Sequence, residues 1–181
     1  MCSIITTVSA STINSKINFY DISPKTIPDI KAEIIKNTPI KSNGVKFHGS
    51  TTWQIKWNIS WKSKNDICYL DTSSATLKVE FTMPRISLAM KPVLNVSNAF
   101  DKYYQALLTH EKGHMNNGEK ALNEVNQLLE NFRSYRECNK LNNAVKSSIT
   151  GVINKYKQLD SVYDEKTNHG KLQGVSFKGF I

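Results

Sequence analysis

The feature that most constrains how this chain can fold is the stretch of residues 97–133, which has no proline and repeats its apolar residues at helical spacing. Steps of three and four residues place side chains on one face of an α-helix. Ser97 or Asn98 can cap the start of this helix, and Arg133 suits the negative end of its dipole. The recurring positions are Phe100, Tyr104, Leu107, Leu108, Glu111, His114, Met115, Leu122, Val125, Leu129 and Phe132. A helix of this length needs a second layer of structure on which to bury that face.

Two histidines lie near the middle of the predicted helix. His110 and His114 are four residues apart and project from the same face, so both imidazoles can bind one metal ion. Glu111 follows the first histidine and can accept a proton from a metal-bound water without being a ligand. The pattern therefore predicts a Zn²⁺ site with a general base. The alternative is a pair of ordinary histidines, either solvated or hydrogen-bonded in the core.

The composition indicates a single soluble domain. The chain has 181 residues, of which 39% are hydrophobic and 22% are charged. We expect a flexible arm over residues 1–15, which are rich in Ser and Thr, and one domain over residues 16–181. No apolar run is long enough to cross a membrane, and no signal peptide is visible at the N-terminus.

Positive charge is spread along the whole chain. The net charge is +9, and the 24 Lys and Arg residues form no long run. This balance favours solubility and electrostatic association with anionic surfaces such as a bacterial envelope. A dedicated nucleic-acid-binding protein usually concentrates its basic residues and interleaves them with aromatic ones. We therefore expect no specific nucleic-acid partner.

Two segments alternate apolar and polar residues with the period of a β-strand. Residues 53–61 place three tryptophans on one face, which favours a core face over the alternative of a sugar-stacking platform. Residues 77–83 alternate in the same way, and Pro84 is expected to end that strand. Polar residues at 64–66 and 71–74 predict turns. Strands joined by polar turns indicate an antiparallel sheet.

Shorter patterns complete the predicted α+β fold. Residues 17–22 are typical of a strand and residues 26–36 of a helix, while residues 140–157 predict a second long helix interrupted at Gly151. The tail after Ser161 is polar and glycine-rich. We expect a zincin-like arrangement, in which an antiparallel sheet packs against the histidine-bearing helix and a further C-terminal helix.

The predicted zinc site needs one more protein ligand. A tetrahedral catalytic zinc usually has three protein ligands and one water. Glu119 and Glu124 are rotated by about 140° and 80° from His114 on a continuous helix, so neither should reach the ion. Glu130 and Glu137 could serve only if the chain turned back sooner than the periodicity predicts. His48 and His169 remain, and turn-forming residues around His169 can bring its side chain close to a site.

The three cysteines lack the spacing of a thiolate zinc site. Cys68 and Cys138 can form one disulfide in an oxidising compartment, which leaves Cys2 unpaired. Free buried thiols are the alternative.

Six segments carry a resemblance to a known family: residues 52–57, Cys68, residues 83–85, residues 108–114, Cys138 and residues 163–174. Together they resemble the bacterial domain-of-unknown-function family 922, whose members are described as predicted secreted zinc-dependent proteases. The resemblance implies a secreted or periplasmic protein, a Cys68–Cys138 disulfide, and a place for the tail histidine in the active site. It implies no particular substrate.

The sequence and the resemblance together predict a zinc-dependent hydrolase, most directly a peptidase acting on a peptide or protein. His110, His114 and His169 are the predicted Zn²⁺ ligands, and Glu111 is the predicted general base. The alternatives are a zinc hydrolase of another bond and a non-catalytic envelope-binding protein with a structural or vestigial zinc site.

Two further residues of the tail are assigned roles at this site. An oxyanion that forms during hydrolysis needs a second electrophile beside the metal. Tyr163 is the first candidate because it lies close to His169 in sequence, and His48 is the second. Asp164 is predicted to accept a hydrogen bond from the N–H of a ligand histidine. Ordinary turn chemistry is the alternative for Tyr163 and Asp164.

Overall fold

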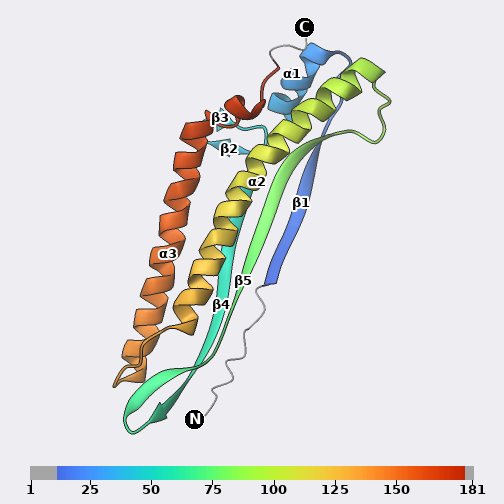
Figure 1. Cartoon of the computed structure of the whole chain (residues 1–181). Coiled ribbons are helices and arrows are strands. Elements are labelled where there is room, and N and C mark those ends of the chain that lie inside the picture. The colour runs from blue at the N-terminus through green and yellow to red at the C-terminus, as the bar shows by residue number, and fades with distance from the viewer. Residues whose placement is uncertain (1–11, 178–181) are drawn as a thin grey trace, which may run out of the picture.

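The structure, a computed structural model, describes residues 12–177 as a mixed β-sheet covered by helices. The long helices α2 (Leu94–Glu130) and α3 (Cys138–Thr167) run side by side, and α2 lies along the sheet (Figure 1). The predicted α+β class is therefore confirmed.

The main sheet has three strands in the order β1-β5-β4. They are β1 (Thr12–Ile22), β4 (Ser50–Lys64) and β5 (Ile67–Ile86). β4 pairs with β5 antiparallel, as predicted, but β1 pairs with β5 in parallel. The prediction of a wholly antiparallel sheet is wrong for this pair, because alternation shows which face of a strand is buried and not the direction of its neighbour.

One of the two predicted turns between the alternating segments exists. Asn65 and Asp66 adopt left-handed backbone angles, with φ of 52° and 59°, in the turn that joins β4 to β5. The second predicted turn, residues 71–74, is wrong, because these residues belong to β5 and Ser73 pairs with Ile59. Polar side chains are common in a strand whose partner is also exposed, and here both strands extend together as one long hairpin.

Pro84 lies inside β5, which continues to Ile86 instead of ending at the proline. The pairing of β4 with β5 reaches only Ser50 opposite Thr82, so the β4 side of β5 has no partner at Pro84. A proline, which has no N–H to donate, is tolerated where one side of the strand is unpaired.

The face of the sheet toward the helices forms much of the core. Trp53 is buried and Trp57 half-buried, whereas Trp61 is 44% exposed near the hairpin tip. The prediction that the three tryptophans of residues 53–61 face the core is therefore confirmed near the start of β4 but not at Trp61. The buried side chains on this face of the two strands include Trp53, Ile55, Cys68, Ala75, Leu77, Val79, Phe81 and Met83.

The first helix, α1 (Ile27–Asn37), agrees with the predicted residues to within one position. Thr26 caps it, and the Thr26 N–H donates to Asp29 Oδ2 at 2.8 Å in a capping box. Ile30 and Ile34, one turn apart, are buried. A small hairpin, β2 (Lys41–Ser42) with β3 (Val45–Lys46), then leads the chain into β4.

The long helix α2 begins and ends three residues before the predicted limits of 97 and 133. Its buried face follows the predicted period, with one exchange: Tyr103 is buried, while Tyr104 is half-buried. His110 and His114 lie in its middle, on the buried face.

The second long helix, α3, differs most from its prediction. It runs without interruption through Gly151 and continues to Thr167, ten residues beyond the predicted end. Gly151 costs roughly 1 kcal/mol relative to alanine, but the apolar face of α3 outweighs that cost. Tyr163 and Asp164 are therefore helical, and the turn interpretation of these two residues is wrong. The buried residues of that face are Leu141, Val145, Ile149 and Val152.

The helix ends in a run of left-handed residues. Asn168 and His169 have φ of 50°, and Gly170 has φ of 78°, which turns the chain back toward α2. The short 3-10 helix η1 (Lys171–Gln173) follows. The tail therefore returns to the histidines, as its turn-forming residues predict.

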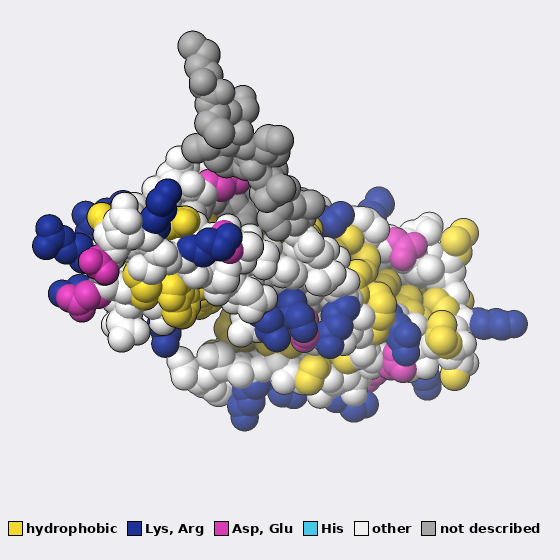
Figure 2. Space-filling model, turned by 90° about the horizontal axis from the view of Figure 1, so that it is seen from below, with side chains coloured by type: hydrophobic (Ala, Val, Ile, Leu, Met, Phe, Trp, Pro, Cys, Tyr) yellow, Lys and Arg dark blue, Asp and Glu magenta, His cyan; other side chains and the backbone are white. Residues whose placement is uncertain are grey.

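Other sequence expectations have mixed outcomes. Residues 12–15 of the expected flexible arm are part of β1, and residues 1–11 lie outside the described residues. Cys68 and Cys138 lie at disulfide-bonding distance, with their Cα atoms 5.2 Å apart. Within residues 12–177, no helix combines the length and apolar character needed to cross a bilayer. Figure 2 shows Lys and Arg side chains spread over the face seen from below, with no single basic patch on that face.

Candidate metal centre

The middle of α2 places three polar side chains in the protein interior. His110, Glu111 and His114 are 5%, 3% and 9% exposed, unusual values for groups that can carry charge. The two imidazole rings lie edge to face, with their centroids 5.1 Å apart. Buried polar groups need partners, and here most of the partners come from α3 and the tail.

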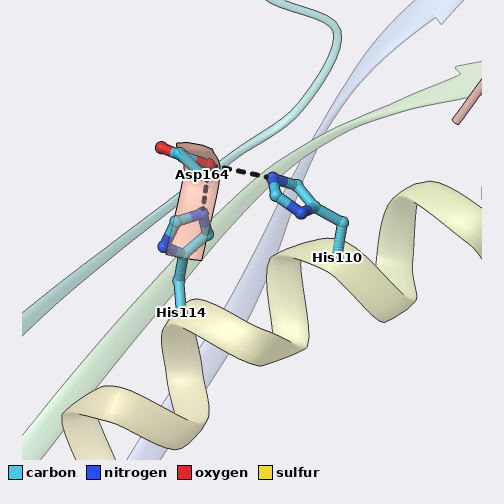
Figure 3. A group of neighbouring side chains, drawn as sticks. All are labelled: His110, His114 and Asp164. Atoms are coloured by element: carbon cyan, nitrogen blue, oxygen red, sulfur yellow. Dashed lines mark hydrogen bonds and ion pairs between the residues drawn. The ribbon is translucent and has the colours of Figure 1, made fainter. Parts of the chain in front are cut away.

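Asp164 of α3 faces both histidines. Its Oδ1 lies 3.2 Å from Nε2 of His110 and 3.2 Å from Nε2 of His114 (Figure 3). One ligand atom from each of the three residues lies within 4.8 Å of the others, which is close enough for all three to hold one metal ion.

The other nitrogen of each ring is also hydrogen-bonded. His114 Nδ1 lies 3.2 Å from Asp160 Oδ1, and a carboxylate can only accept, so this nitrogen donates its hydrogen. His110 Nδ1 similarly donates to Gln173 Oε1 at 2.9 Å. With hydrogen on both Nδ1 atoms, each ring has its lone pair on Nε2 when it is neutral, and Nε2 is the nitrogen that faces Asp164.

When both rings are neutral, Asp164 Oδ1 therefore faces two acceptor nitrogens at 3.2 Å each, without a donor between them. Such an arrangement requires a cation, either a proton or a metal ion. In the metal-free protein a proton takes this place. Burial lowers the pKa of His114, but the hydrogen bonds to Asp160 and Asp164 outweigh it and raise the pKa to about 9. Burial also raises the pKa of Asp164, yet its bonds to the two histidines leave that pKa well below the usual range.

The partners of the histidines are themselves fixed. Asp160 accepts from Trp53 Nε1 at 2.7 Å and from Asn117 Nδ2 at 2.9 Å, so β4, α2 and α3 meet at this carboxylate. Gln173 Nε2 donates to the Tyr163 hydroxyl at 2.9 Å, and that hydroxyl donates to the His110 carbonyl at 3.2 Å. Residues that orient metal-ligating histidines in this way strengthen metal binding and set the tautomer.

Glu111 lies beside this group and is held by β4. Thr51 Oγ1 is 2.7 Å from Glu111 Oε2 and 3.0 Å from the Glu111 carbonyl. Gly49 passes so close that a Cβ at this position would lie 3.0 Å from Glu111 Oε1, so a larger residue would require Glu111 or Leu107 to shift. Burial raises the pKa of the Glu111 carboxyl above its usual value, although the bond from Thr51 and the nearby histidines oppose this.

An open cleft of about 510 Å³ gives solvent access to these groups. Glu111 and the three candidate ligands line it, residues 45–51 form one wall, and His169 and Lys171 contribute from the tail. A buried acid, two imidazoles and a carboxylate at the base of a cleft are the chemical groups expected of a metal-dependent active site.

One family matches the chain over residues 17–170, and it is described as "Bacterial protein of unknown function (DUF922)". The chain belongs to this family. The predicted resemblance is confirmed, and the matched residues of this DUF922 protein include Glu111, both histidines and Asp164. No curated protein and no solved structure gives a significant match to the chain.

In this DUF922 chain the structure places Asp164, and not His169, in the group of possible ligands. The His169 side chain is 59% exposed, and its Nδ1 lies 3.8 Å from Asp164 Oδ1. His169 lines the same cleft, so its predicted role as a ligand stays a prediction. Asp164, predicted to accept a hydrogen bond from a ligand histidine, faces Nε2 of both rings instead of Nδ1 of one.

Tyr163, the first candidate to stabilise an oxyanion, does not line the cleft. Its ring stacks on His110 with centroids 5.2 Å apart, and its hydroxyl is engaged by the His110 carbonyl and Gln173. Tyr163 therefore packs against His110 outside the lining of the cleft. His48, the second candidate, does line the cleft.

Sequence reasoning missed Thr51, Asp160 and Gln173. Asp160 and Asp164 are one helical turn apart, so extending the predicted helix beyond residue 157 would have placed both carboxylates on one face. Thr51 and Gln173 gave no local signal, because an isolated Thr in a strand or Gln in a tail is ordinary.

Proposed function

We propose that this DUF922 protein is a zinc-dependent hydrolase, with His110, His114 and Asp164 as ligands and Glu111 as the general base. The convergence of two Nε2 lone pairs and a carboxylate oxygen carries the proposal, because these atoms repel one another unless a cation lies between them. The buried carboxyl of Glu111 lies beside these atoms, as expected of a general base at a catalytic metal site.

The donor set fits Zn²⁺ better than Mg²⁺ or Ca²⁺. Imidazole nitrogens favour zinc and other transition metals, whereas Mg²⁺ and Ca²⁺ take oxygen ligands. Two histidines and one carboxylate leave the fourth position of a tetrahedral site free, as catalytic zinc sites require. The hydrogen bonds from Nδ1 to Asp160 and Gln173 are those that orient metal-ligating histidines.

In the proposed reaction Glu111 takes a proton from a water that attacks a carbonyl carbon, and passes it to the leaving group. A bound Zn²⁺ would supply a Lewis acid that lowers the pKa of that water. The raised pKa of Glu111 makes it a stronger base than an exposed glutamate. Thr51 bonds one carboxylate oxygen of Glu111, and the other oxygen lies next to Gly49 in the lining of the cleft.

A peptide is the substrate class that the surroundings favour. β4 is an edge strand in the described sheet, and its first residues, Ser50 and Thr51, line the cleft next to Glu111. An unpaired strand edge can bind an extended peptide through backbone hydrogen bonds. Hydrolysis of another carbonyl bond is the alternative within the same chemistry.

We also propose that the protein works outside the cytoplasm, in the periplasm or after secretion. Cysteine pairs at bonding distance, such as Cys68 and Cys138, form stable disulfides in oxidising compartments. The net charge of +9 would favour association with an anionic envelope there.

The rival function is a non-catalytic protein whose metal is structural. Structural zinc sites are usually closed by four protein ligands. His169 is the residue that could close this one, since it lies 3.8 Å from Asp164 at the cleft. The open cleft and the buried Glu111, which a structural site would not need, favour catalysis.

The first test compares the zinc-loaded parent with Glu111→Gln on a mixture of unstructured peptides. The amide keeps the size of Glu111 and its bond from Thr51 but cannot take a proton. We expect equal zinc content and a loss of hydrolysis of about a hundredfold or more. Parent protein that binds no zinc, or Glu111→Gln that cleaves at the parent rate, would show that the proposed function is wrong.

The second test asks whether the site is open or closed. His169→Ala is compared with His48→Ala in zinc content and in activity. If Asp164 is the third ligand, both variants keep near-stoichiometric zinc. Zinc lost only from His169→Ala would make His169 a ligand, and would favour the closed, structural site.

A further inference from the structure

His48 is fixed in the cleft by two tyrosines from different elements. The Tyr20 hydroxyl of β1 donates to the His48 carbonyl at 2.5 Å, which pins the backbone just before β4. The Tyr103 hydroxyl of α2 pairs with His48 Nδ1. The ring therefore lines the same cleft as Glu111 with one nitrogen already occupied.

The protonation states of the three groups define which way the hydrogen bond runs. Tyr103 is 1% exposed and stacks on Phe177 with centroids 4.3 Å apart. Burial raises the pKa of both Tyr103 and Tyr20, so both phenols keep their hydrogen. Burial, followed by the charge of Lys31, lowers the pKa of His48, so its ring is neutral at pH 7.

A phenol is a stronger hydrogen-bond donor than a neutral imidazole N–H, and an imidazole nitrogen is a stronger acceptor than a phenol oxygen. The pair therefore favours Tyr103 as donor and His48 Nδ1 as acceptor. Tyr103 donating to Nδ1 therefore leaves the His48 hydrogen on Nε2. The result is a neutral N–H donor on the wall of the cleft, held in place before any ligand binds. Preorganised donors of this kind are effective at stabilising charge that develops during a reaction.

We propose that His48 donates this Nε2–H hydrogen bond to the carbonyl oxygen of the substrate as that oxygen becomes negative. This role rests on the proposed function and gives the site its second electrophile. Tyr163 cannot fill this place without leaving Gln173 and the His110 carbonyl. His48 acts on the oxygen, while Glu111 handles the proton of the attacking water, so the two roles are chemically separate.

The tautomer can be tested without a substrate or a metal. Nitrogen-15 NMR of the imidazole side chains of the metal-free protein at pH 7 should show His48 with hydrogen on Nε2 only. Tyr103→Phe removes the phenol donor and should give a mixture of tautomers, whereas Tyr104→Phe removes a neighbouring hydroxyl and should leave the spectrum unchanged. A His48 ring with hydrogen on Nδ1, or a charged ring, overturns the proposal.

The donor role can be tested with methylphosphonate, a small tetrahedral oxyanion, titrated into Co²⁺-loaded protein and followed by the visible spectrum of the metal. His48→Phe should bind the metal normally but bind methylphosphonate about tenfold or more weakly. His48→Gln retains an N–H donor and should recover part of that loss. Equal methylphosphonate affinity in the parent and both variants overturns the role of His48. Failure of the parent to bind Co²⁺ would instead contradict the proposed function.

Discussion

The two ends of α3 are held against the rest of the molecule by different chemistry. At its start, Cys138 lies at disulfide-bonding distance from Cys68 of β5, and we call this the disulfide end. At the other end, Asp160 and Asp164 face the histidines of α2, and we call this the metal end. Between them, α3 packs on α2 through buried apolar side chains.

One helix therefore joins a part of the fold held by a cysteine pair to a part whose side chains could hold a metal ion. At the disulfide end, the backbones of Cys68 and Tyr135 also pair in both directions, at 2.6 and 2.9 Å. At the metal end, one ligand atom from each of His110, His114 and Asp164 lies within 4.8 Å of the others, so these residues could share a proton or hold a metal ion. We therefore expect redox conditions to control stability at the first end, and pH and metal to control it at the second.

The largest expected effect is at the metal end. Asp164→Asn replaces a charged ligand with a neutral amide, and zinc affinity should fall by about a thousandfold or more, since each ligand carries a large share of the binding free energy. Glu165→Gln is the matched control, because it neutralises the adjacent carboxylate outside the ligand group. Competition with a zinc-sensitive dye measures both. Unchanged affinity in Asp164→Asn would remove Asp164 from the ligand set.

The next effect is at the disulfide end. Replacing Cys68 and Cys138 together by serine should lower the free energy of unfolding by about 2–4 kcal/mol, as expected for opening a loop with a sequence separation of 70 residues. Chemical denaturation measures the loss, and zinc content should not change. Thiol titration of denatured, unreduced parent protein should find one free thiol, that of Cys2. Three free thiols would show that this end is held by packing alone.

Replacing either of two glycines in the long helices by alanine should have a smaller effect on stability, and the two effects should have opposite signs. A Cβ at Gly113 would lie 2.2 Å from Tyr163 Cζ, so Gly113→Ala must displace Tyr163 from His110 and should cost about 2 kcal/mol of stability. Gly151→Ala meets nothing within 4 Å and should gain about 0.5–1 kcal/mol through helix propensity. Thermal unfolding compares them. A stabilised Gly113→Ala would mean that Tyr163 does not pack tightly at the metal end.

The smallest effect is a dependence of stability on pH. In the metal-free protein, the bonds to Asp160 and Asp164 raise the pKa of His114 to about 9 against the effect of burial. A pKa raised on folding stabilises fully below the unfolded value of 6.5, and this contribution is lost as the pH rises through about 9. We expect a loss of about 1 kcal/mol across this interval, because the partner carboxylate of Asp164 is 32% exposed and water screens the pair.

Zinc provides the control for this pH dependence, because a bound metal ion would replace the proton between the proposed ligands. Zinc-loaded protein should not lose stability between pH 6.5 and 9. At acid pH the dependence has the opposite sign, because the pKa of Asp164 is lowered on folding. Its contribution to stability is fully present above the unfolded value of 3.8 and is lost as the pH falls below that value. A metal-free protein whose stability rises from pH 6.5 to 9 would contradict the proton-sharing arrangement.

The sequence by itself determined the parts of this protein that depend on neighbours in the chain. The spacing of His110 and His114 predicts a shared helical face, and alternation predicts the buried sides of β4 and β5. Each inference uses a fixed repeat of the backbone, so no knowledge of the partner is needed.

Only the tertiary structure decided which residues complete the site. Asp164 reaches His110 because α3 continues beyond residue 157. In that last part of the helix, Asp160 bonds to Trp53 and Asn117, and Tyr163 stacks on His110. Those contacts join residues more than forty positions apart. The sequence also did not predict that β1 pairs with β5 in parallel, because the relative direction of two strands depends on the path of the chain between them. Local periodicity fixes which side chains share a face, whereas the free energy of packing fixes how far an element extends and what that face meets.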